Sequence, residues 1–312
     1  MEQANLLKGY LNEGRREGVV LPATTGPLQT IDGFGEIRLR VARYQDVDAS
    51  FSVVEMELGQ GDSVPRHTNT LNERTLICYG GEGVVKSGGK ETPFKQGGSL
   101  FVSRGAYVEI IQQGTEPLRF TTISLVPDAA DADDLFPLSL KGLVIGDGAD
   151  APGAQVLLEQ EEEGYHYWQA APSLGYITMK FEEEMPHDYY FSISSQTLDP
   201  GSQVRHHGHV KSTEVAICTR GRGRAVIFDT ELEYGLGDLL IFPPTVTHHF
   251  INDSGEPWTY TGIFTPRSVE DALRKTGVRK LPGMERPVGI PRNPDTERML
   301  VEQYGFIIPG IS

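Results

Sequence analysis

Residues 201–221, GSQVRHHGHVKSTEVAICTRG, set His207 and His209 two positions apart and follow them with Glu214. Residues i and i+2 of a β-strand point to the same side of a sheet, so both imidazoles can reach one point. Strict alternation would turn Glu214 to the opposite side. We therefore expect a turn near residues 211–212 and a new strand that begins at the glutamate.

A second stretch, residues 237–252, reads GDLLIFPPTVTHHFIN and adds a third histidine, His248. It follows Glu214 by 34 residues, so only tertiary folding can bring it to the first two histidines. Three imidazoles and one carboxylate suit a divalent transition ion such as Fe, Mn, Ni, Co, Cu or Zn, whereas Mg and Ca prefer oxygen ligands. The two stretches together indicate a metal site.

The sequence also repeats itself. A shift of 140 residues aligns residues 35–67 with residues 175–207 without a gap. Past that point, one inserted residue in the second copy places Glu73 opposite Glu214. A period this long that occurs only twice indicates two similar domains and not a solenoid of short units.

We expect the domains to span residues 1–140 and 141–312, with an acidic Ala/Asp/Gly-rich linker around residues 127–155. Within each copy, segments of 4–7 residues rich in Val, Ile, Phe, Tyr and Thr alternate with Gly, Pro, Asp and Ser. Many short strands at such spacing predict an all-β sandwich or barrel. Helices are expected only at the periphery, at residues 3–12, 269–276 and 294–304, the last with Asn293 as cap and Gly305 beyond its end.

The two stretches quoted above match the signature motifs of the cupin superfamily, with Thr245 where the family usually has glycine. The chain as a whole resembles a bicupin over about residues 35–127 and 175–265. This resemblance implies two tandem double-stranded β-helix (jelly-roll, cupin) domains with a few peripheral helices. It also implies that the metal ligands are His207, His209, Glu214 and His248.

The first copy has lost most of this motif. His67 and Glu73 remain, but Asn69 stands in the place of His209, Val108 in the place of His248, and Ser103 in the place of the second-motif proline. Two ligands and an amide do not make a tight transition-metal site. We expect this degenerate domain to have a structural role and to carry a dimer contact, because symmetric pairing is common.

The resemblance to quercetinase-like bicupins implies a metal-dependent dioxygenase with one divalent metal per chain, Fe(II) first among the candidates. Its substrate would be a small oxygenated molecule, aromatic or enolic. Glu214 would either serve only as a metal ligand or also take a proton from a bound hydroxyl. A cupin isomerase, lyase or decarboxylase that uses the metal only as a Lewis acid is an alternative enzyme class. A non-enzymatic bicupin that binds a small molecule is a further alternative.

Several neighbours of the motif have two interpretations. His206 and His249 should point away from the metal by strand alternation. Arg205 and Arg224 would bind an anionic substrate or form exposed ion pairs. A third set would wall the cavity or simply fill the core: Phe191, Ile193, Ala216, Phe250 and Tyr260.

The amino-acid composition limits the kinds of partner that the protein can bind. The chain has 28 Lys and Arg against 43 Asp and Glu, a formal charge of −15, and no basic block. A protein that binds phosphate backbones needs the opposite charge, so we expect no nucleic acid partner. No apolar segment is long enough to span a membrane, so we expect a cytoplasmic protein with no membrane partner. We also expect a homodimer. Cys78 and Cys218 occupy nearly matching places in the two copies, so we expect buried, unpaired thiols.

Overall fold

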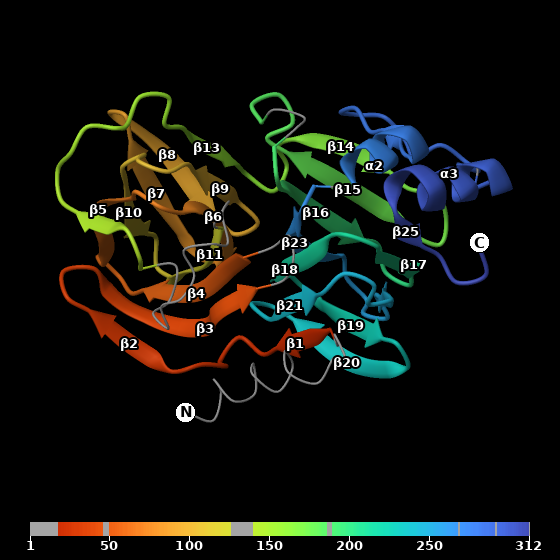
Figure 1. The fold of residues 1–312 in the computed structure, drawn as a ribbon, viewed down its shortest axis with the longest axis horizontal. Coiled ribbons are helices and arrows are strands. Elements are labelled where there is room, and N and C mark those ends of the chain that lie inside the picture. The colour runs from red at the N-terminus through yellow and green to blue at the C-terminus, as the bar shows by residue number, and fades with distance from the viewer. Residues whose placement is uncertain are drawn as a thin grey trace. The chain divides into compact units, whose positions relative to one another are not determined.

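The computed structural model describes residues 18–45, 50–125, 140–185, 189–267, 269–290 and 292–311. In these residues the chain is almost entirely antiparallel β-structure, as expected (Figure 1). It divides into two compact units. The first unit contains Thr24–Glu162, and the second contains Glu163–Ser312 together with described residues 18–23.

In its described residues, the first unit is built from twelve strands in two sheets. They are β2 Leu28–Ile31, β3 Gly35–Gln45, β4 Ser50–Leu58, β5 Ser63–Asn69, β6 Glu73–Gly80, β7 Glu82–Ser87, β8 Lys90–Lys95, β9 Ser99–Val102, β10 Val108–Gln113, β11 Leu118–Leu125, β12 Leu143–Ile145 and β13 Val156–Glu159. One sheet has the order β13-β9-β6-β11-β4-β3-β2 and the other β12-β5-β10-β7-β8.

The described residues of the second unit repeat this plan with thirteen strands. They are β1 Val19–Leu21, β14 Tyr165–Trp168, β15 Gly175–Lys180, β16 Ser192–Leu198, β17 Gln203–His209, β18 Thr213–Arg220, β19 Arg222–Ile227, β20 Thr230–Gly235, β21 Leu239–Phe242, β22 His248–Ile251, β23 Trp258–Thr265, β24 Val278–Arg279 and β25 Phe306–Ile307. The sheet orders are β1-β21-β18-β23-β16-β15-β14-β24 and β20-β19-β22-β17-β25.

The strand register relates the two units by a constant shift of 140 residues. Arg74 of β6 lies opposite Val102 of β9, and Glu214 of β18 lies opposite Phe242 of β21 in the same way. The insertion of one residue, which the sequence predicts for the second copy, is therefore wrong. Arg74, not Glu73, occupies the position of Glu214.

The turns after these strands confirm the same register. Gly81 and Gly221 both have positive φ, 67° and 70°. A Cβ at either position would approach a carbonyl oxygen, at 2.1 Å for Pro117 and 2.9 Å for Pro257. Only glycine fits this turn without strain, so Gly81 is the glycine equivalent to Gly221.

Part of the expected linker is structured. Residues 126–139 lie outside the described residues, but β12 pairs with β5 and β13 pairs with β9. Both pairings extend the sheets of the first unit, so the linker expected around residues 127–155 is wrong over β12, and β13 begins directly after its expected end. The domain ranges 1–140 and 141–312 remain a proposal.

Each unit has its own apolar core between its two sheets. Cys78 belongs to the first core and Cys218 to the second, and both thiols are free and fully buried, as expected. In the second core the indole of Trp258 donates to the Cys218 sulfur at 3.2 Å. The thiols therefore serve packing and not a disulfide.

The described residues contain two helices, α2 Glu270–Thr276 between β23 and β24 and α3 Pro294–Tyr304 between β24 and β25, and they pack against each other (Figure 1). As expected, the side chain of Asn293 caps α3 by accepting from the Thr296 backbone at 2.9 Å, and Gly305 ends it in the left-handed region. The helix expected at residues 3–12 lies outside the described residues. In the described part of the chain, no helix has the length and apolarity needed to cross a bilayer.

Glu270 of α2 predicts a pH-dependent stability. Its side chain is buried 3.4 Å from Arg267, and burial raises its pKa from 4.5 to about 7. Because the pKa is raised in the folded state, the ionised carboxylate destabilises the fold. This destabilisation is absent below the unfolded-state pKa and complete above pH 7. We expect Glu270→Gln to leave the free energy of unfolding unchanged at pH 4 and to raise it by up to about 3 kcal/mol at pH 8. Urea denaturation measures this difference, and an equal effect at both pH values would contradict it.

Candidate metal centre

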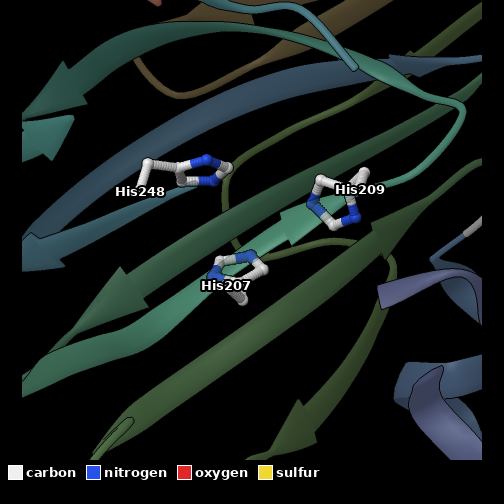
Figure 2. Close-up of side chains that lie close together, drawn as sticks. All are labelled: His207, His209 and His248. Atoms are coloured by element: carbon white, nitrogen blue, oxygen red, sulfur yellow. The ribbon is translucent and has the colours of Figure 1, made fainter. Parts of the chain in front are cut away.

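Three strands of the second unit bring the four predicted ligands together. His207 and His209 lie on β17, His248 lies on β22 directly opposite His207, and Glu214 lies on β18. As expected, β17 ends at His209 and a new strand begins at Thr213, so the turn between them returns the glutamate to the same side. In Figure 2 the three imidazoles surround a common point.

The distances define a compact cluster. One ring nitrogen from each of the three histidines lies within 4.8 Å of the other two. The Oε2 atom of Glu214 lies 3.3 Å from His248 Nε2 and 3.8 Å from His209 Nε2. His209, Glu214 and His248 are buried. These three imidazoles could hold a divalent metal, and the carboxylate lies beside them as a fourth donor.

Backbone hydrogen bonds orient two of the rings. His207 Nδ1 lies 2.9 Å from the Arg205 carbonyl oxygen, and His248 Nδ1 lies 3.1 Å from that of Val246. A carbonyl oxygen only accepts, so both Nδ1 atoms carry the proton and both Nε2 atoms carry a lone pair. This is the tautomer that a metal ion requires of a histidine that binds through Nε2.

The polar atoms at the centre lack partners. His248 Nε2 and both ring nitrogens of His209 are buried without a hydrogen bond. His248 Nε2 also faces Glu214 Oε2, so two acceptors oppose each other when the carboxylate is ionised. Buried polar atoms are normally paired, and a shared cation would satisfy His248 Nε2, one ring nitrogen of His209 and the Glu214 carboxylate at once. The donor set therefore fits a transition metal.

The surroundings set the protonation of the cluster. Burial lowers the pKa of His207 and His248 to about 3 and that of His209 well below its ordinary value. Burial also raises the pKa of Glu214 to about 7. The imidazoles are thus neutral at physiological pH, and neutral imidazole is the form that binds a metal.

Aromatic rings enclose the imidazoles. Phe242 stacks on His248 with ring centroids 3.8 Å apart, and Phe264 meets His209 edge-on at 5.4 Å. Phe306 contacts both His207 and His209, because β25 pairs with the end of β17. The sequence motif does not include Phe306, and its only signal is the apolar segment that follows the end of α3.

A cavity opens beside the cluster, lined only by residues of the second unit. Of the five candidate wall residues, Phe250 and Tyr260 line it, and Phe191, Ile193 and Ala216 are not among its lining residues. Further apolar groups come from β23, α2, α3 and β25, and polar groups come from Ser194, Gln196, Arg205, Arg292 and Glu297.

Apart from Glu214 at the histidine cluster, the cavity wall contains two cations, Arg205 and Arg292, and one anion, Glu297. Glu297 forms an ion pair with Arg205, and its other oxygen lies 3.7 Å from Arg292 Nε. One carboxylate thus serves two guanidinium groups and leaves a net positive charge. Arg224, in contrast, pairs with Glu231 and Asp253 and does not line the cavity. Arg205 therefore remains a candidate for binding an anionic substrate, whereas Arg224 forms ion pairs away from the cavity.

The equivalent positions of the first unit carry one imidazole where the second unit carries three. His67, Asn69 and Val108 take the places of His207, His209 and His248. The Asn69 side chain accepts from the backbones of Leu71 and Asn72 and donates to the Lys141 carbonyl. The amide therefore holds a loop in place instead of acting as a ligand.

Comparisons with known proteins agree with this architecture. Residues 194–264 match the family model described as a cupin domain. No curated protein matches the sequence. Among solved structures, oxalate decarboxylase from Bacillus subtilis is 15% identical, with a TM-score of 0.55 and coverage of 82% of this chain and 78% of that one.

Two further structures have similar folds. Procruciferin, an 11S globulin from Brassica napus, is 11% identical with a TM-score of 0.59, covering 80% of this chain and 83% of its own. Lactobacillus farciminis oxalate decarboxylase, solved as a formate complex, is 16% identical with a TM-score of 0.53, covering 80% and 86%. Such low identities establish the fold and not the activity. With a match to the cupin domain in the second unit and the same strand plan in the first, the chain has the fold of a bicupin.

Proposed function

We propose that this bicupin is a metal-dependent dioxygenase that acts on a small oxygenated substrate, aromatic or enolic, in the cavity of the second unit. The proposed ligands are His207, His209, Glu214 and His248. One divalent transition metal per chain is proposed, Fe(II) first, with Mn, Ni, Co, Cu or Zn as alternatives. The observation that carries the proposal is the group of buried ring nitrogens without partners that face the Glu214 carboxylate beside a cavity.

A bound ion of this kind would polarise a substrate oxygen and support chemistry with dioxygen. The residues of the chain do the rest. Glu214 lines the cavity, so its carboxylate can accept the proton of a substrate hydroxyl. Phe250, Tyr260 and Phe264 offer flat apolar surfaces for a ring. Phe306 covers His207 and His209 and keeps water from that side of the cluster.

A Lewis-acid enzyme, such as a decarboxylase, is the second candidate. The net positive charge of Arg205, Arg292 and Glu297 favours it, because this part of the wall suits a substrate carboxylate. The two oxalate decarboxylases among the similar structures add support through the fold alone. The same metal site would then act without consuming oxygen.

The two candidates differ in one measurable quantity, the oxygen consumed per substrate converted. We expect oxygen uptake by the Fe(II)-loaded protein with a flavonol or another enolic phenol in a panel measured at an oxygen electrode. Turnover of oxalate or related acids under strict anaerobiosis by the Mn(II)-loaded protein would select the second candidate instead. No conversion in either panel would leave a bicupin that binds a small molecule without transforming it, and would contradict both.

The quaternary state completes the proposal. We propose that the chain forms a homodimer, since closed symmetric pairs are the commonest oligomers. Light scattering coupled to size-exclusion chromatography measures the mass directly. A monomer would overturn the dimer without affecting the proposed metal chemistry, because the four proposed ligands all belong to one chain.

A further inference from the structure

At the position equivalent to Glu214, the first unit has a positively charged side chain. Arg74 takes the place of Glu214, opposite Ser124 of β11 as Glu214 is opposite Phe264 of β23. Leu76 and Cys78, two and four residues further along β6, belong to the core of the first unit. By strand alternation Arg74 faces the same interior. The unit has thus exchanged an acidic metal ligand for a guanidinium group.

This guanidinium group is buried without compensation. Arg74 is 4% exposed, and no carboxylate among the described residues forms an ion pair with it. Burial lowers its pKa to about 10, so it still carries its charge at neutral pH. Its neighbour His67 remains neutral, because burial and the charge of Arg74 lower the His67 pKa to about 3. A buried charge of this kind normally has a partner.

The unpaired atoms point to the shape of that partner. Nε and Nη2 of Arg74 are both buried without a hydrogen bond. These two atoms lie on one edge of the planar guanidinium group, and their N–H bonds run parallel at the spacing of the two oxygens of a carboxylate. The buried hydroxyl of Ser124, directly opposite in register, also lacks a partner.

The surrounding side chains limit the size of the partner. Val102 and Val108 stand where the second unit has Phe242 and His248, and Ser124 stands where it has Phe264. Each of these three replacements is smaller than its counterpart, whereas the arginine is larger than the glutamate it replaces. Val102 and Val108 belong to the apolar core, which suits a small anion and not an extended charged chain.

We propose that the first unit binds a small carboxylate, of the size of formate or acetate, with both oxygens on the Nε and Nη2 edge of Arg74 and the Ser124 hydroxyl as a third donor. The degenerate cupin domain is then a carboxylate site built on the plan of a metal site. It does not depend on the metal or the activity proposed for the second unit.

Equilibrium dialysis of radiolabelled formate against the full-length protein tests this site, at constant ionic strength and after treatment with a chelator. We expect Arg74→Met to bind one formate per chain fewer than the parent protein. Arg74→Lys keeps the charge but loses the two-donor edge, so we expect it to bind at least about tenfold more weakly. Formate should also raise the melting temperature of the parent by several degrees and leave that of Arg74→Met unchanged.

The matched control is Arg119→Met, which removes an exposed arginine of the same unit that pairs with Glu57. It should bind formate as the parent does. Without formate, Arg74→Met should be at least as stable as the parent, because an apolar side chain replaces an uncompensated buried charge. Equal formate binding by the parent, Arg74→Met and Arg74→Lys would overturn the proposal. So would a melting temperature of the parent that does not respond to formate or acetate.

Discussion

The His248→Ala variant is expected to lose the metal. Protein purified without chelator should contain about one transition-metal equivalent per chain, and the variant less than about a tenth of that. His248 supplies an Nε2 lone pair held in place from behind by the Val246 carbonyl, and alanine supplies no donor. Turnover should fall by about 100-fold or more, because the remaining groups no longer meet around a cation. Elemental analysis and the oxygen electrode measure the two losses.

His249→Ala is the matched control for this variant. His249 adjoins His248 in the sequence, but its ring packs on His206, with centroids 5.4 Å apart, on the other side of β22. Removing it should change neither the metal content nor turnover. An unchanged metal content in His248→Ala would contradict the proposed centre. Circular dichroism of both variants distinguishes loss of the metal from loss of the fold.

The sequence was sufficient for the local geometry of the site. The i, i+2 spacing of His207 and His209 fixes their common side in any strand, and the expected turn before Glu214 follows from the same alternation. The structure has both features. The position of His248 next to them needed the family resemblance, because no local rule connects residues 34 positions apart in sequence.

The register of the first unit could not be read in this way. The sequence alignment paired Glu73 with Glu214 because the two residues are identical. The backbone hydrogen bonds of the strands instead place Arg74 at the position of Glu214. An alignment favours identical residues, whereas the register of a β-sheet depends on the lengths of its strands and turns. The missed arginine is the residue that gives the first unit its chemistry.

Tertiary pairing accounts for the other omissions. Val19–Leu21 forms an edge strand of the second unit's large sheet through β21, and Leu143–Ile145 extends a sheet of the first unit. Each is three residues long and carries no alternation that sets it apart from a loop. Phe306 reaches the histidines for the same reason: a two-residue strand docks on β17 after α3. Short edge strands of this kind are specified by the sheet they join.

The ring of Phe242 links the stability of the second unit to its metal site. It is 1% exposed, belongs to the core and stacks on His248. Phe242→Ala removes this contact and leaves a cavity, so we expect the free energy of unfolding to fall by about 3–5 kcal/mol. Phe242→Leu keeps most of the volume and should cost less than about 1.5 kcal/mol.

Because the ring also fixes the orientation of His248, metal affinity should fall further in Phe242→Ala than in Phe242→Leu. Urea denaturation of the metal-free and metal-loaded proteins measures both effects, since an ion that binds only the folded state stabilises it in proportion to its affinity. Phe228→Ala, at a side chain 47% exposed, is the control and should change stability by no more than about 0.5 kcal/mol. If Phe242→Ala lost stability but bound the metal as tightly as the parent, His248 would be oriented by its backbone hydrogen bond alone. If it lost less than about 1 kcal/mol, the core around the site would not be packed as the structure has it.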